Sequence, residues 1–259
     1  MEHADTTRLE FTHQADAMSG HRLFTSGDVV DWFRDSVVAS RGALVLDLAC
    51  GPGIISAALA PYAQHVSGVD LTPRMIEHAR ERCSAAGLTN TEFQEASAEH
   101  LPFSADRFDS VVTRLSFHHF TDVPAVLSEI RRVLKPEGRL LIADIISSPN
   151  PAEAGLQDAL ENLRDPSHVR MLPETELVQM VQSAGFSIQS VDSLANEREF
   201  SEWAAIVSGA RSLDSLEVVM RRLAENGVTA GIGLRTVNDG LFFDHHWRLV
   251  TAQKVFRSE

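Results

Sequence analysis

The residues with the clearest chemical potential are two glycines and two acids. An apolar run over residues 44–48 contains Asp47 and leads into Gly51 and Gly53, and a second apolar run ends at Asp70, 17 positions after Gly53. Glycine adopts backbone angles closed to other residues, and the free N–H groups at the start of the next helix favour an anion. A carboxylate at the end of the neighbouring strand can accept hydrogen bonds from both hydroxyls of a ribose. This spacing predicts a nucleoside-cofactor site.

Two classes of nucleotide cofactor use this arrangement, and Ser56 and Asp47 distinguish them. A dinucleotide site has a third glycine, which allows close helix packing, at the position where this chain has Ser56. Asp47 would repel a pyrophosphate, but it suits a cofactor with a cationic amino-acid end, held directly or through water. The cofactor that combines adenine, ribose and such an end is S-adenosylmethionine. We therefore expect an S-adenosylmethionine site and not a hydride-transfer site.

Five short segments between about residues 40 and 145 have an order and spacing found in a known family. They are Val45–Gly53, Gly68–Thr72, Ala98–Phe103, Phe108–Val112 and Leu134–Arg139. With them the chain resembles the class I S-adenosylmethionine-dependent methyltransferases, in the small-molecule group that includes the ubiquinone and menaquinone C-methyltransferases. One such segment alone would be a weak signal, but the five together are specific.

The resemblance implies which residues bind the methionine and ribose parts of the cofactor. Asp47, Gly51 and Gly53 would hold the methionine end, and Asp70 would bind the ribose. Arg114 begins the stretch to His119, which in relatives lines the cavity beside the methionine portion and the transferable methyl.

The resemblance also implies the adenine contacts. Leu71 and Met75 would pack on the ring, and the backbone N–H of Ala98 would bond to it. Relatives often have Asp before this alanine, where it accepts a hydrogen bond from the adenine amino group. Here the residue is Ser97, which can accept the same bond more weakly.

Two adjacent histidines, His118 and His119, follow the fourth predicted strand and are the candidate catalytic residues. Methyl transfer depends mainly on alignment in a dry pocket, so a base helps only where the nucleophile is a hydroxyl, a protonated amine or an activated carbon acid. Imidazole has a pKa near neutrality and suits that role. The alternative is that one ring packs on the cofactor, the other bonds a backbone group, and neither transfers a proton.

His168 and Arg170 are the candidate substrate-binding residues. They belong to the segment Asp165–Arg170, which resembles a segment that borders the substrate cavity in many small-molecule relatives. The alternative is a turn in which these two side chains tie a helical cap to the core.

Composition excludes several classes of partner. The chain has 23 Lys and Arg against 36 Asp and Glu, a formal net charge of −13, so nucleic acid is not an expected substrate. His245 and His246 beside Asp244 lack a further ligand at a suitable spacing, so we expect no metal. With two cysteines, no signal-peptide pattern and no apolar run of 18 residues, we expect a cytoplasmic protein without a membrane span, acting as a monomer or homodimer on a small molecule.

Alternating apolar runs and helical patterns predict an α/β fold. We expect a Rossmann-like, seven-stranded, mostly parallel sheet with an antiparallel last strand, helices on both faces and a helical cap. The expected strands cover residues 43–48, 65–70, 91–95, 108–113, 139–145, 186–194 and 241–255. The expected helices cover residues 54–62, 73–86, 122–134, 173–184, 199–209 and 214–226.

The flanking regions predict covers for the cofactor. Residues 1–40 are expected to form an N-terminal helical lid, because Phe11, Ala15 and Met18 share one helix face and Asp28 can cap a second helix. Residues 41–259 would form the cofactor-binding domain, with helical cap insertions at about 146–180 and 198–238.

These observations predict an S-adenosylmethionine-dependent methyltransferase that acts on O, N or C of a small, apolar or aromatic metabolite and releases S-adenosylhomocysteine. One alternative keeps the fold and the cofactor but catalyses cyclisation or decarboxylation. Another is a non-catalytic S-adenosylmethionine-binding subunit.

Overall fold

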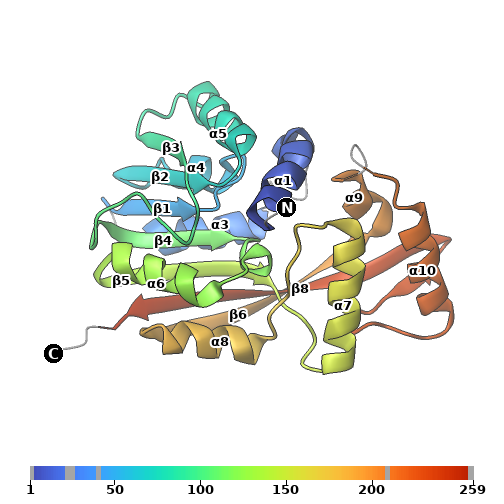
Figure 1. The fold of residues 1–259 in the computed structure, drawn as a ribbon. Helices are drawn as coiled ribbons and strands as arrows, with labels where there is room; N and C mark the ends of the chain where they lie inside the picture. The colour runs from blue at the N-terminus through green and yellow to red at the C-terminus, as the bar shows by residue number, and fades with distance from the viewer. Residues whose placement is uncertain (1–2, 21–26, 39–41, 208–210, 256–259) are drawn as a thin grey trace.

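The computed structural model describes residues 3–20, 27–38, 42–207 and 211–255, and it has an α/β architecture (Figure 1). The strands described are β1 (Leu44–Leu48), β2 (His65–Asp70), β3 (Thr91–Glu95), β4 (Phe108–Arg114), β5 (Leu134–Ile145), β6 (Phe186–Glu199), β7 (Arg235–Val237) and β8 (Gly240–Lys254). The helices described are α1 (His3–Gly20), α3 (Gly27–Val38), α4 (Ile54–Leu59), α5 (Pro73–Ala85), the 3-10 turn η1 (Phe117–His119), α6 (Val123–Val133), α7 (Pro151–Arg164), α8 (Glu174–Ser183), α9 (Phe200–Ala205) and α10 (Asp214–Glu225).

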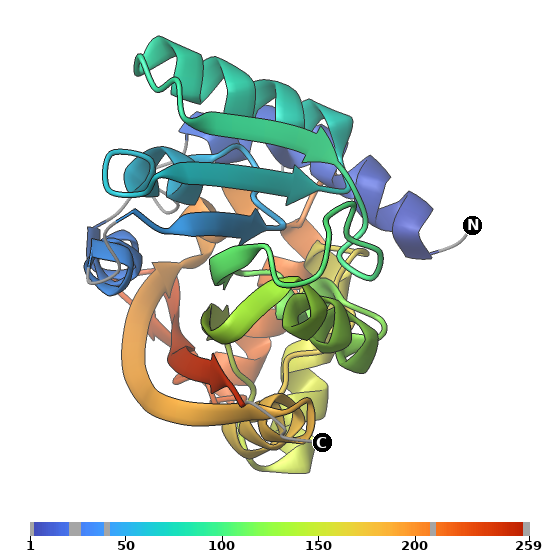
Figure 2. The ribbon, with the colours of Figure 1, turned by 90° about the vertical axis from the view of Figure 1, so that its left-hand side faces the viewer.

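The described strands form one sheet in the order β3-β2-β1-β4-β5-β8-β6, and the view along the sheet shows them stacked in this order (Figure 2). The first five strands pair in parallel, and β8 runs antiparallel between β5 and β6. This agrees with the predicted sheet except for an eighth strand, β7, which pairs with β8. The two strands join through Asn238 and Asp239, whose φ values of 46° and 65° suit a tight two-residue hairpin.

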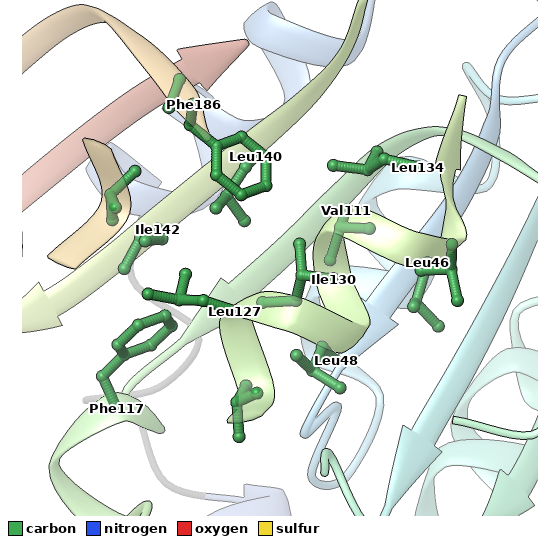
Figure 3. Packing of buried hydrophobic residues seen from close by; sticks show 14 of the residues in the cluster. Leu46, Leu48, Val111, Phe117, Leu127, Ile130, Leu134, Leu140, Ile142 and Phe186 are labelled. Carbon is green, nitrogen blue, oxygen red and sulfur yellow. The ribbon is translucent and has the colours of Figure 1, made fainter. Parts of the chain in front are cut away.

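Each face of the parallel sheet is covered by helices because the strands are apolar on both sides. On one face, Leu127 and Ile130 of α6 pack against Val111 and Leu140 of the sheet (Figure 3). On the other face, α3 and α4 cover the sheet, with Phe33 of α3 fully buried. The sheet is therefore rigid up to the edge where the parallel strands end.

The cap is built on an extension of β6 and β8, which continue well beyond β5 (Figure 1). Its core joins α7, α9, α10 and β8 through buried residues that include Leu160, Trp203, Met220 and Phe243. The predicted cap of about 146–180 is too long, because α8 packs with α6 against the sheet, where Leu177 is buried. An apolar helix face alone does not reveal which layer it joins.

The N-terminal segment contains the two predicted helices. α1 lies between α5 and the cap, next to the edge where the parallel strands end (Figure 1). Ala15 is fully buried, but α3 starts at Gly27, so Asp28 lies in its first turn and does not precede it. Residues 1–2, 21–26 and 39–40 of this predicted helical region, and the end of the predicted helix at 199–209, lie outside the described residues.

Candidate active site

A cavity of about 190 Å³ opens at the carboxyl ends of β1, β2 and β4. Its walls come from the turn after β1, the loops after β2 and β3, and helix α1. Eight of the nine residues predicted to bind the cofactor line this cavity, and the exception is Gly53. The parallel topology brings them together because consecutive strands end at the same edge of the sheet.

Asp70 at the end of β2 supports the glycine turn. Its Oδ2 accepts a hydrogen bond from the N–H of Gly51 (2.9 Å), and its Oδ1 accepts one from the N–H of Thr72 (2.9 Å). Burial raises the pKa of Asp70, and these N–H groups oppose that shift because they stabilise the carboxylate. Gly51 has a φ of 51°, and a Cβ there would meet no heavy atom within 4 Å, so its backbone faces open space.

Gly53 and Ser56, at the start of α4, support the turn through packing and a hydrogen bond. A Cβ on Gly53, which has a φ of 75°, would lie 2.8 Å from Ala79 of α5, so glycine is required for α4 to start this close to α5. Ser56, where a dinucleotide site has its third glycine, donates a 2.6 Å hydrogen bond from Oγ to Oδ2 of Asp47. Gly53 thus has a packing role in this structure, and Ser56 orients the acid of β1.

Asp47 and Arg114 place opposite charges on the wall of the same cavity. Burial raises the pKa of Asp47 to about 7 and lowers the pKa of Arg114 to about 10, and the charge of each residue opposes the shift of the other. A carboxylate beside a guanidinium complements the ammonium and carboxylate of a free amino acid. This wall can therefore hold an amino-acid end of a ligand.

The cavity also has apolar lining residues. Leu71 and Met75 line it, and the side chain of Met75 is almost fully buried. Ser97 and Ala98 line it as well, and Oγ of Ser97 accepts a hydrogen bond from the N–H of Glu99 (3.2 Å). A hydroxyl with this contact still has a lone pair and its own hydrogen to offer to a ring.

Helix α1 covers the cavity with side chains that include His3, Thr7 and Phe11. Nε2 of His3 donates to the carbonyl oxygen of His119 (3.2 Å), and Nε of Arg8 donates to that of Leu71 (3.3 Å). These bonds join α1 to the segments after β4 and β2.

A second cavity of about 80 Å³ extends from the first toward the cap. The two cavities share Phe11, Met18, Leu115 and His119 as lining residues. Side chains from α7, β6, α9 and β8 complete the second cavity. Ligands in the two cavities would meet at the shared residues.

His118 lines the second cavity and is paired with Asp144 near the end of β5. Its Nδ1 lies 2.6 Å from Oδ1 of Asp144, whose Oδ2 accepts hydrogen bonds from the N–H groups of Ser116 and Phe117. Burial opposes a charge on His118, but the charge of Asp144 and the hydrogen bond to it outweigh burial and raise the pKa of His118. Because the carboxylate accepts from Nδ1, Nε2 of the neutral ring carries a lone pair.

The environment of His119 lowers its pKa, whereas that of His118 raises the pKa of His118. Its Nδ1 donates to the carbonyl oxygen of Ser167 (2.9 Å), and its ring meets Phe11 edge-on with 4.9 Å between centroids. Burial, together with the charge of His118, lowers the pKa of His119 to about 3. This ring stays neutral at pH 7 and packs between the two cavities.

His168 and Arg170 line neither cavity. Nε2 of the buried His168 lies 2.8 Å from Oδ1 of Asp158, and the half-exposed Arg170 pairs with Glu176. The backbone N–H of Arg170 donates to the carbonyl oxygen of His118 (3.2 Å). These contacts fit the structural alternative, in which the segment ties the cap to the core and fixes the loop of His118.

The second cavity also contains a charged group that the sequence did not reveal. Glu161 lies 3.4 Å from Arg164 and 3.6 Å from His245. Burial alone would raise the pKa of Glu161, but the hydrogen bond to His245 and the charge of Arg164 lower it to about 2. The guanidinium of Arg164 stacks over the ring of Trp203, 4.8 Å from its centroid. The charged groups of Glu161 and Arg164 thus both interact with partners within the cap.

Asp144 is the missed residue that had a sequence signal. It follows the buried run 140–143 at the carboxyl end of a strand, as Asp47 and Asp70 do in their strands. Glu161, Arg164 and Arg198 had no such signal, because they reach the cavity from cap elements far apart in the chain.

Two absences concern the described residues only. No described helix is long and apolar enough to cross a bilayer. Within the same residues, no group of three or more His, Cys, Asp or Glu side chains is arranged to hold a metal ion.

The chain is similar to known proteins along most of its length. A family model described as a methyltransferase domain matches residues 46–142. The chain is 31% identical over 198 residues to an uncharacterized methyltransferase, YcgJ, of Bacillus subtilis, covering 76% of this chain and 78% of that protein. It is 33% identical over 196 residues to an uncharacterized protein, YafE, of Escherichia coli, covering 74% of this chain and 93% of that protein.

A solved structure agrees with these sequence similarities. The crystal structure of YcgJ from Bacillus subtilis superposes with a TM-score of 0.79 and 28% identity, covering 88% of this chain and all of that one. Fold, cavity and sequence therefore agree, and the chain belongs to the methyltransferase-domain family and is a methyltransferase.

Proposed function

We propose that this methyltransferase uses S-adenosylmethionine to methylate a hydroxyl of a small-molecule acceptor, with His118 as the general base. Membership of the family implies use of this cofactor. The observation that supports an acceptor that must lose a proton is the His118–Asp144 pair on the wall of the second cavity, and among such acceptors we propose a hydroxyl.

The donors and acceptors of the first cavity suit this cofactor. Asp70 offers a carboxylate to the ribose, and Asp47 with Arg114 offers opposite charges to the methionine end. The open face of Gly51 lets a ligand approach the main chain. Leu71 and Met75 supply an apolar surface for the adenine, with Ser97 and Ala98 at its edge.

Bound S-adenosylmethionine supplies a methyl group made electrophilic by the adjacent sulfonium. Nε2 of His118 would accept the proton of the acceptor hydroxyl as its oxygen takes the methyl group that the cofactor would supply, with S-adenosylhomocysteine as the leaving product. Asp144 fixes the tautomer of His118 and stabilises the imidazolium that forms. His119 and Phe11 exclude water between the two cavities, which helps alignment.

His168 and Arg170 have no direct contact with the acceptor in this proposal. They act on substrate binding through the loop of His118, which their segment holds by a backbone hydrogen bond. Helix α1 serves as the N-terminal lid, because it covers the first cavity and borders the second.

The test is incubation of the protein with methyl-labelled S-adenosylmethionine and a cell extract, followed by mass spectrometry of labelled products. We expect a labelled methyl ether and one equivalent of S-adenosylhomocysteine, both lost in His118→Gln. Turnover of a metabolite without release of S-adenosylhomocysteine would indicate a cyclase or decarboxylase. Cofactor binding without any product would indicate a non-catalytic subunit.

A further inference from the structure

Arg198 brings a cationic group to the second cavity from the extended part of β6. In the register of β6 and β8, Arg198 pairs with Phe243, Asn196 with His245 and Leu194 with Trp247. Paired residues of antiparallel strands lie on the same face of the sheet, and successive residues along each strand lie on opposite faces. Arg198 therefore shares its face with His245 and Trp247, which also line the cavity.

The guanidinium of Arg198 has no hydrogen bond or ion pair of 4 Å or less with any residue of the described chain. Burial lowers the pKa of Arg198, and the attraction of Glu202 only partly offsets that shift. A half-buried cation without a close partner costs free energy, which an anion in the cavity would offset.

The acids that line the cavity with Arg198 are bonded to other groups, and Glu202, the acid that attracts Arg198, is not among the lining residues. Glu161 pairs with Arg164 and His245, while Asp165 accepts hydrogen bonds from Gln14 and Ser167. Burial alone would raise the pKa of Asp165, but its neighbours lower it to about 2, so it stays ionised in those bonds. Arg198 is thus a cation of this cavity that no acid of the described residues contacts within 4 Å.

Aromatic and apolar side chains line part of the cavity. Trp203, Trp247, Ile206 and Phe11 line it. Within the described residues, the buried Nε1–H of Trp247 has no hydrogen-bond partner. A flat apolar body fits these walls, and an anionic group on that body would meet Arg198.

We propose that Arg198 binds a carboxylate of the methyl acceptor, so that the substrate class is small carboxylic acids with an aromatic or apolar body. This assignment rests on the proposed function, because it takes the second cavity as the acceptor site. Arg198 would orient the acid end, and the hydroxyl end would meet His118, which lines the same cavity.

The experiment compares matched pairs of probes: benzoate against benzamide, and 3-phenylpropanoate against its amide. Binding to the full chain is measured by ligand-observed NMR with and without saturating S-adenosylhomocysteine. We expect each acid to bind about tenfold or more tightly than its amide. Arg198→Gln should remove this preference, and Arg198→Lys should retain part of it.

The matched control is Arg235→Gln, because Arg235 lies on β7 in ion pairs with Asp244 and Glu197 and lines neither cavity. It should keep the preference of the wild type. Equal signals from acid and amide in the wild type, including no signal from either, would overturn the proposal. An unchanged preference in Arg198→Gln would overturn it as well.

A calorimetric titration with S-adenosylhomocysteine separates this proposal from the proposed function. Arg198 does not line the first cavity, so Arg198→Gln should bind S-adenosylhomocysteine like the wild type. If the wild type does not bind that compound, the proposed cofactor is wrong, whereas the acid and amide comparison without it still tests Arg198.

Discussion

Oγ of Ser56 donates a 2.6 Å hydrogen bond to Oδ2 of Asp47, which joins the first helix after the glycine turn to the acid of β1. The contact replaces the glycine of a dinucleotide site with a hydroxyl that orients a carboxylate. Asp47 is almost fully buried, and Arg114 is the cation that interacts with it across the cavity wall. We therefore expect cofactor binding to depend on pH.

Binding of S-adenosylhomocysteine should weaken as the pH falls below about 7, the pKa to which burial raises Asp47. The ammonium group of the ligand favours the ionised form of Asp47. Below pH 7, Asp47 of the free protein must therefore lose a proton when the ligand binds, and the affinity falls by up to about tenfold per pH unit. Calorimetry in buffers of different ionisation enthalpy measures the released proton. Asp47→Asn should bind more weakly at pH 8 and show no such slope, and an identical slope in this variant would refute the assignment.

Asp70→Asn should weaken binding of S-adenosylmethionine by about 1–3 kcal/mol, because the carboxylate is replaced by a group that accepts fewer hydrogen bonds. The variant retains the size of the side chain and one acceptor oxygen, so one of the two backbone N–H groups bonded to Asp70, those of Gly51 and Thr72, keeps its acceptor. Calorimetric affinity is the measurement. Asp192→Asn on the exposed part of β6 is the control and should change nothing. Unchanged affinity in Asp70→Asn would remove the ribose assignment.

His118→Gln should lower the methylation rate by roughly 10²-fold or more, because the base is lost. In the wild type the rate should fall as the pH decreases through the raised pKa of His118, since only the neutral ring accepts a proton. Asp144→Asn should shift this fall to lower pH because the neighbouring negative charge is gone. His119→Gln should leave the position of the fall unchanged, and a pH-independent wild-type rate would argue against a histidine base.

Glu161→Gln should destabilise the fold at pH 7 by about 3 kcal/mol. His245 and Arg164 outweigh burial and lower the pKa of Glu161 from 4.5 to about 2, and this pKa shift corresponds to a free energy of that size. Because folding lowers its pKa, Glu161 stabilises the fold at pH values above its ordinary pKa of 4.5. This contribution to stability is lost as the pH falls from 4.5 toward 2. Urea unfolding at pH 7, 5 and 3.5 should therefore show a shrinking difference from the wild type. Glu225→Gln, at the exposed end of α10, should show no difference at any of these values.

Arg211→Gln should speed cofactor release. Glu10 of α1 is buried and pairs with Arg211 near the cap, so the variant leaves an acid buried without its cation and favours an open lid. We expect the dissociation rate of S-adenosylhomocysteine in stopped flow to rise about fivefold, which corresponds to about 1 kcal/mol. The double variant Glu10→Gln with Arg211→Gln removes the buried charge and should recover part of the change. Equal rates in all three proteins would show that α1 does not control release.

The sequence by itself determined the sheet and the first cavity. Asp47, Gly51 and Asp70 belong to a strand, a turn and the next strand, so chain connectivity alone brings them to one edge. Helix α8 was also predictable, because an apolar periodicity ends at Gly185, whose φ of 88° suits a helix end. Contacts of this kind depend on residues close in the chain or on the fixed order of parallel strands.

Tertiary structure alone decided the second cavity and the roles around it. His118 meets Asp144 across 26 positions, and Arg198 reaches the same cavity because β6 extends beyond its predicted end at residue 194. β7 was missed because a three-residue strand has too little alternation to detect, and its pairing with β8 forms through long-range packing of the cap. His168 and Arg170 pair with Asp158 and Glu176, which are only 10 and 6 positions away but belong to α7 and α8, so the packing of these helices against the segment decided the partners.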